Sequence, residues 1–121
     1  MKRLFLLALL LSGCAHASPV ALTWTYPRFN AAPGCLAASD TLKDLSRCEI
    51  YARRAGRTDS VLVFSKICAG LEARDDSATV DQPKGSTDYW LYTYDAIGNQ
   101  SCRSSVVTRL VAGKPLAALL R

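Results

Sequence analysis

Residues 89–101 read YWLYTYDAIGNQS and predict a strand followed by a tight turn. Aromatic residues and one threonine occupy five of the first six positions, and such residues favour a pleated strand. In the turn, Asp95 can accept backbone N–H bonds, while Gly98 and Asn99 tolerate positive φ. We therefore expect one arm of a β-hairpin here, with a last strand over residues 104–111.

The chain before this stretch follows the same two-residue periodicity. Val20, Leu22 and Trp24 alternate with smaller or polar residues, which is typical of a half-buried strand. Turn signals recur every 8–12 residues, as in a β-sandwich. Further strands are expected at residues 48–53, 61–68 and 78–80, a turn-rich loop at 30–34, and a single short helix candidate at 115–121.

Three stretches resemble fibronectin type III domains. LTWTYP (22–27) resembles their Trp-bearing early strand, and CEIY (48–51) their Y-x-I-Y strand with cysteine in the first tyrosine position. YWLYTYDAIGNQS resembles their Y-x-V-x-A-x-D-x-x-G-N-x-S ending. The resemblance covers residues 19–111 and implies an all-β, immunoglobulin-like β-sandwich of about 6–7 antiparallel strands. The cysteines and the weak first strand depart from the family pattern.

The N-terminus has the layout of a bacterial secretory signal. Met1-Lys2-Arg3 is followed by an apolar run over residues 4–11, and Leu11-Ser12-Gly13-Cys14 resembles the lipobox of bacterial lipoproteins. This resemblance implies acylation (palmitate) at Cys14 and a membrane attachment through an N-terminal lipid anchor. No aspartate follows Cys14, which favours the outer membrane, with the domain facing the periplasm or the surface.

A second interpretation of this N-terminal region remains open. Ala15-His16-Ala17 is an A-x-A pattern, after which an ordinary signal peptidase can cut before Ser18. That cut discards Cys14 and releases a soluble periplasmic or secreted protein. Either way, we expect a signal and lipobox region at 1–17, a domain at 18–111 and a tail at 112–121.

Length and charge exclude several classes of protein. The 121 residues fit one domain, and no other apolar stretch approaches the ~20 residues of a bilayer span. Without Lys2 and Arg3, 13 of the 15 basic residues remain against 10 acidic ones, a net charge of +3. These charges are scattered, whereas a nucleic-acid reader concentrates them in a stripe. We expect no nucleic-acid partner.

The four cysteines after Cys14 predict two disulfides, because an even number in a small exported chain favours that chemistry. Zinc ligands come in close pairs, whereas these cysteines are 13, 20 and 34 positions apart. Three connectivities are open. A hairpin of residues 48–54 with 61–68 places Cys48 near Cys68, leaving Cys35 for Cys102. In a fibronectin-like sandwich the loops that carry this second pair lie at the same end.

Catalytic chemistry has little support. His16 is the only histidine and lies in the signal region, so no Ser-His or Cys-His pair can form inside the domain. Neither EF-hand spacing nor a Gly-rich phosphate loop is present. The sequence therefore predicts no catalytic residue, no metal and no cofactor. The remaining carboxylates sit among turn residues and are expected to be solvated: Asp40, Asp44, Asp75, Asp76 and Asp81.

An aromatic patch is the candidate binding site. The family resemblance implies that Tyr89, Leu91 and Thr93 point inward, which directs the residues between them outward. With Cys48, Ile50 and Ala52 buried, the outer face would carry Tyr51, Arg53, Trp90, Tyr92 and Tyr94. Tryptophan, tyrosine and arginine are the residue types of binding hot spots.

Two alternatives to an open patch remain. The tail residues Leu116, Leu119 and Leu120, or a dimer partner, could cover it, or a one-residue register error could exchange the two faces. The expected function is a non-catalytic binding module of the cell envelope that contacts a protein or glycan. The competing expectation is a structural accessory lipoprotein of an envelope or phage-related complex.

Overall fold

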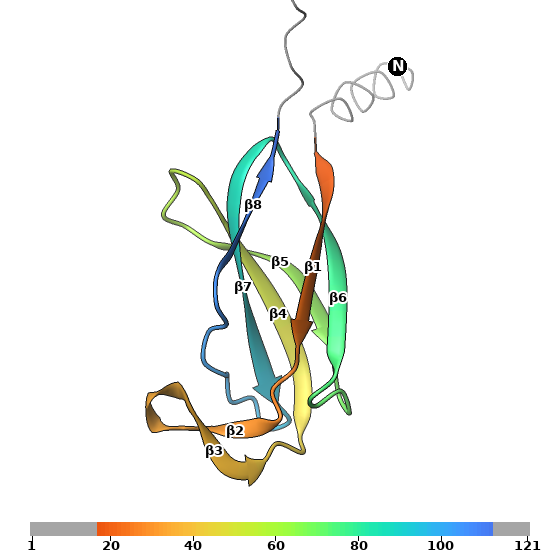
Figure 1. Cartoon of the computed structure of the whole chain (residues 1–121), viewed down its shortest axis with the longest axis vertical. Coiled ribbons are helices and arrows are strands. Elements are labelled where there is room, and N and C mark those ends of the chain that lie inside the picture. The colour runs from red at the N-terminus through yellow and green to blue at the C-terminus, as the bar shows by residue number, and fades with distance from the viewer. Residues whose placement is uncertain (1–16, 113–121) are drawn as a thin grey trace, which may run out of the picture.

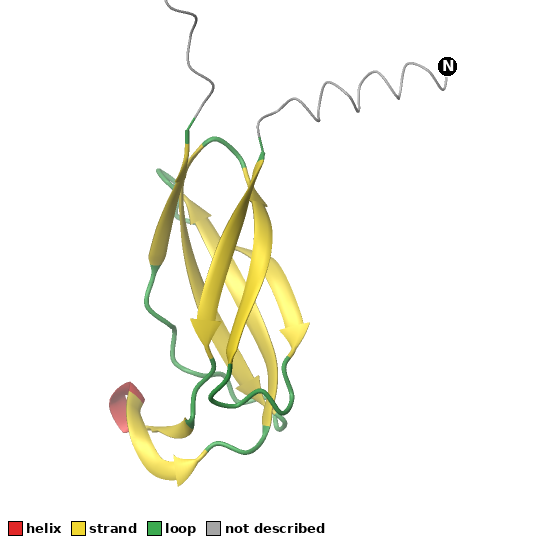
Figure 2. Cartoon of the chain, turned by 45° about the vertical axis from the view of Figure 1, so that its right-hand side comes forward, coloured by secondary structure: helices red, strands yellow, loops and turns green. Residues whose placement is uncertain are grey.

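Eight β-strands form the fold of residues 17–112, the part of the chain that the computed structural model describes (Figures 1 and 2). The predicted all-β class is confirmed, and no helix within residues 17–112 is long and apolar enough to cross a membrane. Cys14 and the helix candidate at 115–121 lie outside the described residues. The elements are β1 (Ser18–Thr25), β2 (Phe29–Ala32), the short 3₁₀ helix η1 (Pro33–Cys35), β3 (Leu36–Thr41), β4 (Leu45–Arg54), β5 (Val61–Ile67), β6 (Asp75–Gln82), β7 (Gly85–Asp95) and β8 (Val107–Val111).

Two antiparallel sheets face each other across the core. One has the strand order β5-β4-β7-β8, and the other contains β1 and β6. Alternate residues of the facing strands meet between the sheets, and each buried aliphatic side chain contributes about 1.5–3 kcal/mol of transfer free energy. The buried cluster consists of Leu22, Ile50, Ala52, Ala78, Val80 and Tyr89.

Several strands differ in length from the prediction, and β4 and β7 begin three and four residues earlier than expected. β6 pairs along all eight residues with β1, although only residues 78–80 were expected to be extended. The last strand begins at Val107 rather than at residue 104. In its place, Ser101 Oγ accepts a hydrogen bond from the Thr93 amide (2.9 Å), and Ser104 Oγ accepts one from the Leu91 amide (2.7 Å). These hydroxyls therefore pair the β7 backbone amides that a neighbouring strand would otherwise pair.

The predicted loop at residues 30–34 is instead part of a hairpin between β2 and β3. Gly34 allows the reversal with φ 75°. A disulfide joins Cys35 of this hairpin to Cys102, with Cα atoms 5.9 Å apart, as predicted. The cross-link holds the hairpin against the segment that follows β7.

The second predicted disulfide, Cys48–Cys68, is not formed, and both residues are buried free thiols. The hairpin numbering placed Cys48 opposite residue 67 or 68, but β4 and β5 pair it with Lys66. Cys68 is therefore a diagonal neighbour. The two thiols still contact each other, since a hydrogen bond between them contributes to the pKa of each, but no S–S bond joins them.

Loss of the observed disulfide should destabilise the domain. We expect Cys35→Ser to lower the free energy of unfolding by about 2–4 kcal/mol, because the bridge restrains two residues 67 positions apart in the unfolded chain. Denaturant unfolding of the oxidised protein measures the difference. Ala37→Ser, at an exposed position of the same hairpin, is the control. Equal midpoints for Cys35→Ser and the parent would contradict the expectation.

Candidate functional site

The outer surface of the four-stranded sheet carries the predicted aromatic patch. β4 and β7 pair so that Tyr51 is opposite Trp90 and Glu49 is opposite Tyr92. Cys48, Ile50, Ala52 and Tyr89 are buried in the core, so the residues between them lie on the opposite face. The predicted facing is therefore confirmed for Tyr51, Arg53, Trp90, Tyr92 and Tyr94, and the one-residue register error is excluded.

Trp90 is not an open stacking platform. The side chain is only 9 % exposed, because the Arg53 and Arg103 guanidinium carbons lie 5.6 and 5.8 Å from its ring centroid. Arg53 is also held by Asp88 (3.5 Å), whose carboxylate accepts a second hydrogen bond from Thr108 (2.6 Å). Two oriented guanidiniums, rather than a bare indole, therefore form this part of the surface.

The other half of the surface is organised around Arg47. Its guanidinium carbon lies 4.3 Å from the Tyr94 ring centroid, and its Nε is 3.4 Å from Glu49 Oε2. Tyr51 donates a hydrogen bond to Glu49 Oε1 (3.0 Å), which raises the pKa of Tyr51 to about 12. The Tyr51 and Tyr92 rings meet edge to face, 5.8 Å apart.

These contacts define a connected surface, here called the outer aromatic face. Sequence reasoning missed three of its members. Glu49 lies within the predicted strand at residues 48–53 and shares the outer alternation with Tyr51, and Arg47 follows from extending that strand one position toward the N-terminus. Arg103 follows the turn after β7 and carries no periodic signal. The face comprises Arg47, Glu49, Tyr51, Arg53, Trp90, Tyr92, Tyr94 and Arg103.

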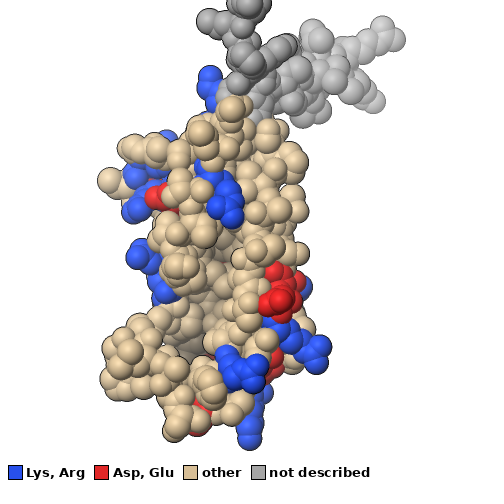
Figure 3. All heavy atoms as spheres, in the orientation of Figure 1, with Lys and Arg blue, Asp and Glu red and all other residues tan. Residues whose placement is uncertain are grey.

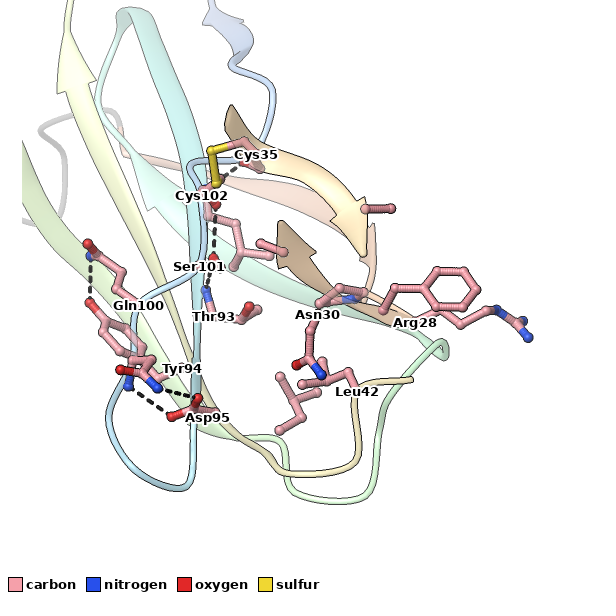
Figure 4. A pocket seen from close by; sticks show the side chains of 18 of the residues that line it. Arg28, Asn30, Cys35, Leu42, Thr93, Tyr94, Asp95, Gln100, Ser101 and Cys102 are labelled. Carbon is pink, nitrogen blue, oxygen red and sulfur yellow. Dashed lines mark hydrogen bonds between the residues drawn. A yellow bond between two sulfur atoms is a disulfide. The ribbon is translucent and has the colours of Figure 1, made fainter. Parts of the chain in front are cut away.

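A cavity of about 720 Å³ lies between the β2–β3 hairpin and the inner face of β7 (Figure 4). Leu42, Leu45 and Leu91 contribute to its wall. Several of its polar groups are already engaged: Ser101 bonds Thr93 and the Cys102 carbonyl, while the Asp95 carboxylate bonds the Asn99 side chain. The cavity therefore offers apolar volume without a free catalytic group among its described lining residues.

Charge is dispersed on the face of the molecule that contains this hollow (Figure 3). Lysine and arginine side chains are scattered over this face, and the charged residues Arg28 and Asp95 are among those that line the hollow. Residues 17–112 contain no group of three metal-ligating side chains.

The buried thiols belong to a polar cluster between the sheets. Tyr26 Oη lies 3.5 Å from Cys48 Sγ and donates to Asp76 (2.7 Å), which also binds Lys66 Nζ (2.7 Å). Burial raises the pKa of the Cys48 thiol and raises that of Cys68 to about 12. Both thiols stay protonated and inaccessible at neutral pH, so the cluster does not support nucleophilic chemistry.

Asp76 corrects one sequence expectation. It was expected to be a solvated loop residue, as were Asp75 and Asp81, but all three lie in β6. Hydrogen bonds from Lys66 and Tyr26 lower the pKa of Asp76 to about 2. Its carboxylate links β6 to β5 and is structural.

Searches against protein-family models, curated proteins and solved structures found no match to this chain. The functional interpretation therefore depends on the geometry of the described residues.

The Asp76 ion pair should make stability depend on acid pH. The folded-state pKa is depressed, so its contribution is complete above the unfolded value of ~3.9 and is lost as pH falls toward about 2. We expect the melting temperature of Asp76→Asn to be below that of the parent at pH 6. The difference should shrink between pH 4 and 2. A difference that stays constant over this range would contradict the assignment.

Proposed function

We propose that this chain is an exported, lipid-anchored, non-catalytic binding module of the bacterial cell envelope, with a fibronectin type III-like domain. The observation that carries the proposal is the outer aromatic face. It joins three arginines to four aromatic rings on one rigid sheet surface. The envelope protein or glycan that it contacts would meet this surface rather than the cavity, where Ser101 and Asp95 are already paired.

The side chains of the face are ordered before any partner arrives. Arg47 and Arg53 are each held by an aromatic ring and a carboxylate, yet 47 % and 41 % of their side-chain surfaces remain exposed. Ordering a flexible side chain on binding costs ~0.5–1.5 kcal/mol, and pre-ordered groups avoid much of that cost. The surface therefore suits a specific contact.

Charge on this face indicates the chemistry of the partner. Arg47, Arg53 and Arg103 outnumber the two carboxylates, Glu49 of the face and the neighbouring Asp88. Both carboxylates already bind arginines of the face. The exposed guanidinium edges can still donate bidentate hydrogen bonds to a carboxylate. A partner that presents acidic groups beside an apolar or sugar ring surface fits this pattern.

The arrangement of strands supports the fibronectin type III-like assignment. Trp24 of β1 packs edge-on against Tyr26 and against Phe64 of β5, so it fills the space between the sheets. The chain departs from the family pattern in two places: the β2–β3 hairpin is added, and within residues 17–112 no strand precedes β1.

A lipid anchor at Cys14 would hold this domain close to the membrane. Only residues 15–17 separate Cys14 from Ser18, where β1 begins. A fully extended chain spans at most ~3.6 Å per residue, so these three residues span no more than about 11 Å.

Acylation is tested by metabolic labelling with a clickable palmitate analogue. We expect the parent to be labelled and membrane-bound, and Cys14→Ser to lose both properties. Cys68→Ser, which removes a buried thiol and leaves the lipobox intact, is the control. An unlabelled, soluble parent whose mature N-terminus is Ser18 would contradict the anchor.

The binding face is tested by photo-crosslinking in intact cells. A photoreactive amino acid replaces Tyr92 on the outer aromatic face or, as a control, Thr79 on the exposed face of β6. We expect a discrete adduct from position 92 only. Arg47→Glu with Arg53→Glu should reduce it at least tenfold without lowering the melting temperature by more than a few degrees. Equal adducts from both positions, or no effect of the charge reversal, would contradict the proposed face.

A further inference from the structure

Arg103 is the one arginine of the outer aromatic face that has no acidic partner in the described part of the chain. Arg47 is paired with Glu49 (3.4 Å) and Arg53 with Asp88 (3.5 Å). Among the described residues, the Arg103 guanidinium forms no ion pair and donates no hydrogen bond, and the residue is exposed. Its charge is therefore available to an acidic group from outside the chain.

The backbone on both sides of Arg103 is fixed to the edge of β7. The Ser101 amide donates to the Thr93 carbonyl (2.8 Å). The Ser104 amide donates to the Leu91 carbonyl (3.0 Å). These bonds hold Arg103 beside β7 although it lies outside a regular strand.

The side chain of Arg103 is placed by Trp90. Its guanidinium carbon lies 5.8 Å from the indole centroid, and that of Arg53 lies 5.6 Å from the same centroid. The preceding residue, Cys102, is held by a disulfide, which restrains the segment further. Asp88 neutralises only Arg53, so a carboxylate bound to Arg103 would balance the second charge on this ring. A side chain ordered in advance loses less entropy on binding.

Exposed aliphatic side chains border the same face along both edge strands of the sheet, β5 and β8. Leu62 and Ile67 of β5 pair with Tyr51 and Arg47, so they point outward, and they are 50 % and 79 % exposed. On β8, Leu110 is 76 % exposed. In protein interfaces, central arginine and aromatic residues carry most of the binding energy and are surrounded by contacts that exclude water. The face has this arrangement.

We propose that the partner of the outer aromatic face is a protein that places an acidic side chain on Arg103 and apolar side chains against Leu62, Ile67 and Leu110. This inference rests on the proposed function and narrows its partner from a protein or glycan to a protein. A carboxylate can accept bidentate hydrogen bonds from Arg103. Apolar side chains of a protein can bury the aliphatic margin, whereas a sugar ring would need an open indole, and Trp90 is covered by two guanidiniums.

A second copy of this chain fits the face poorly. In a two-fold dimer the same patch meets itself, which would bring the arginines of one copy toward those of the other. The nearby carboxylates, Glu49 and Asp88, are already paired within the chain. Opposition of like charges disfavours such a contact.

Photo-crosslinking from position 92 in intact cells tests the role of Arg103. We expect Arg103→Glu to reduce the adduct at least tenfold, because the acidic group of the partner would then meet a like charge. Mass spectrometry of the digested parent adduct should show a peptide of another protein joined at position 92. The matched control is Arg74→Glu, an exposed arginine outside the face, which should leave the adduct unchanged. Melting temperatures of both variants should stay within a few degrees of the parent.

The aliphatic margin is tested in the same assay. We expect Leu110→Asn to reduce the adduct at least threefold, because an amide replaces an apolar contact. The control is Ile97→Asn, an equally exposed aliphatic position in the turn after β7, which should have no effect. Equal adducts from these two variants would contradict the apolar part of the proposal.

The remaining outcomes separate this inference from the proposed function. A complete lack of adduct from position 92 would contradict the binding face, and this inference with it. An adduct that carries a glycan, or a peptide of this same chain, would keep the face and overturn the protein partner. Equal adducts from Arg103→Glu and Arg74→Glu would show that Arg103 does not bind the acidic group.

Discussion

The pairing of β4 with β7 is the constraint on which the rest of the structure depends. Nine residues of β4 are paired with β7, and this register decides which side chains enter the core. Ile50 and Ala52 meet Leu22 of the opposite sheet, while Tyr51 and Arg53 stay on the outer face. A slip of one residue would bury the Arg53 guanidinium and expose Ile50, which burial energetics strongly disfavours. Core and candidate site therefore depend on the same register.

Sequence predicts this part of the fold because apolar residues mark its inward positions. In β4 the inward residues are Cys48, Ile50 and Ala52, so the alternation of apolar and polar residues can be recognised in the sequence. In β6 the inward positions are Ala78, Val80 and Gln82, and the outward ones are aspartate, serine and threonine, which resemble turn residues. Its full length became visible only through its pairing with β1. The β2–β3 hairpin had no alternation to reveal it.

The site was predictable to the extent that it follows from strand alternation. That rule places Trp90, Tyr92 and Tyr94 on one face, but it cannot show what lies above them. Arg103 reaches Trp90 from an irregular segment, where side-chain direction depends on the path of the chain after the turn. The predicted Cys48–Cys68 disulfide was wrong for a related reason, because a shift of one or two residues in the hairpin register places Lys66 opposite Cys48.

Nuclear Overhauser contacts in the oxidised protein test the β4–β7 register most directly. The account predicts contacts between the Tyr51 and Tyr92 rings on the outer face, and between the Ile50 and Leu22 methyl groups across the core. Contacts from the Tyr51 ring to the Leu22 methyl groups, with Ile50 in solvent, would show the opposite facing. That result would contradict both the core and the proposed binding face.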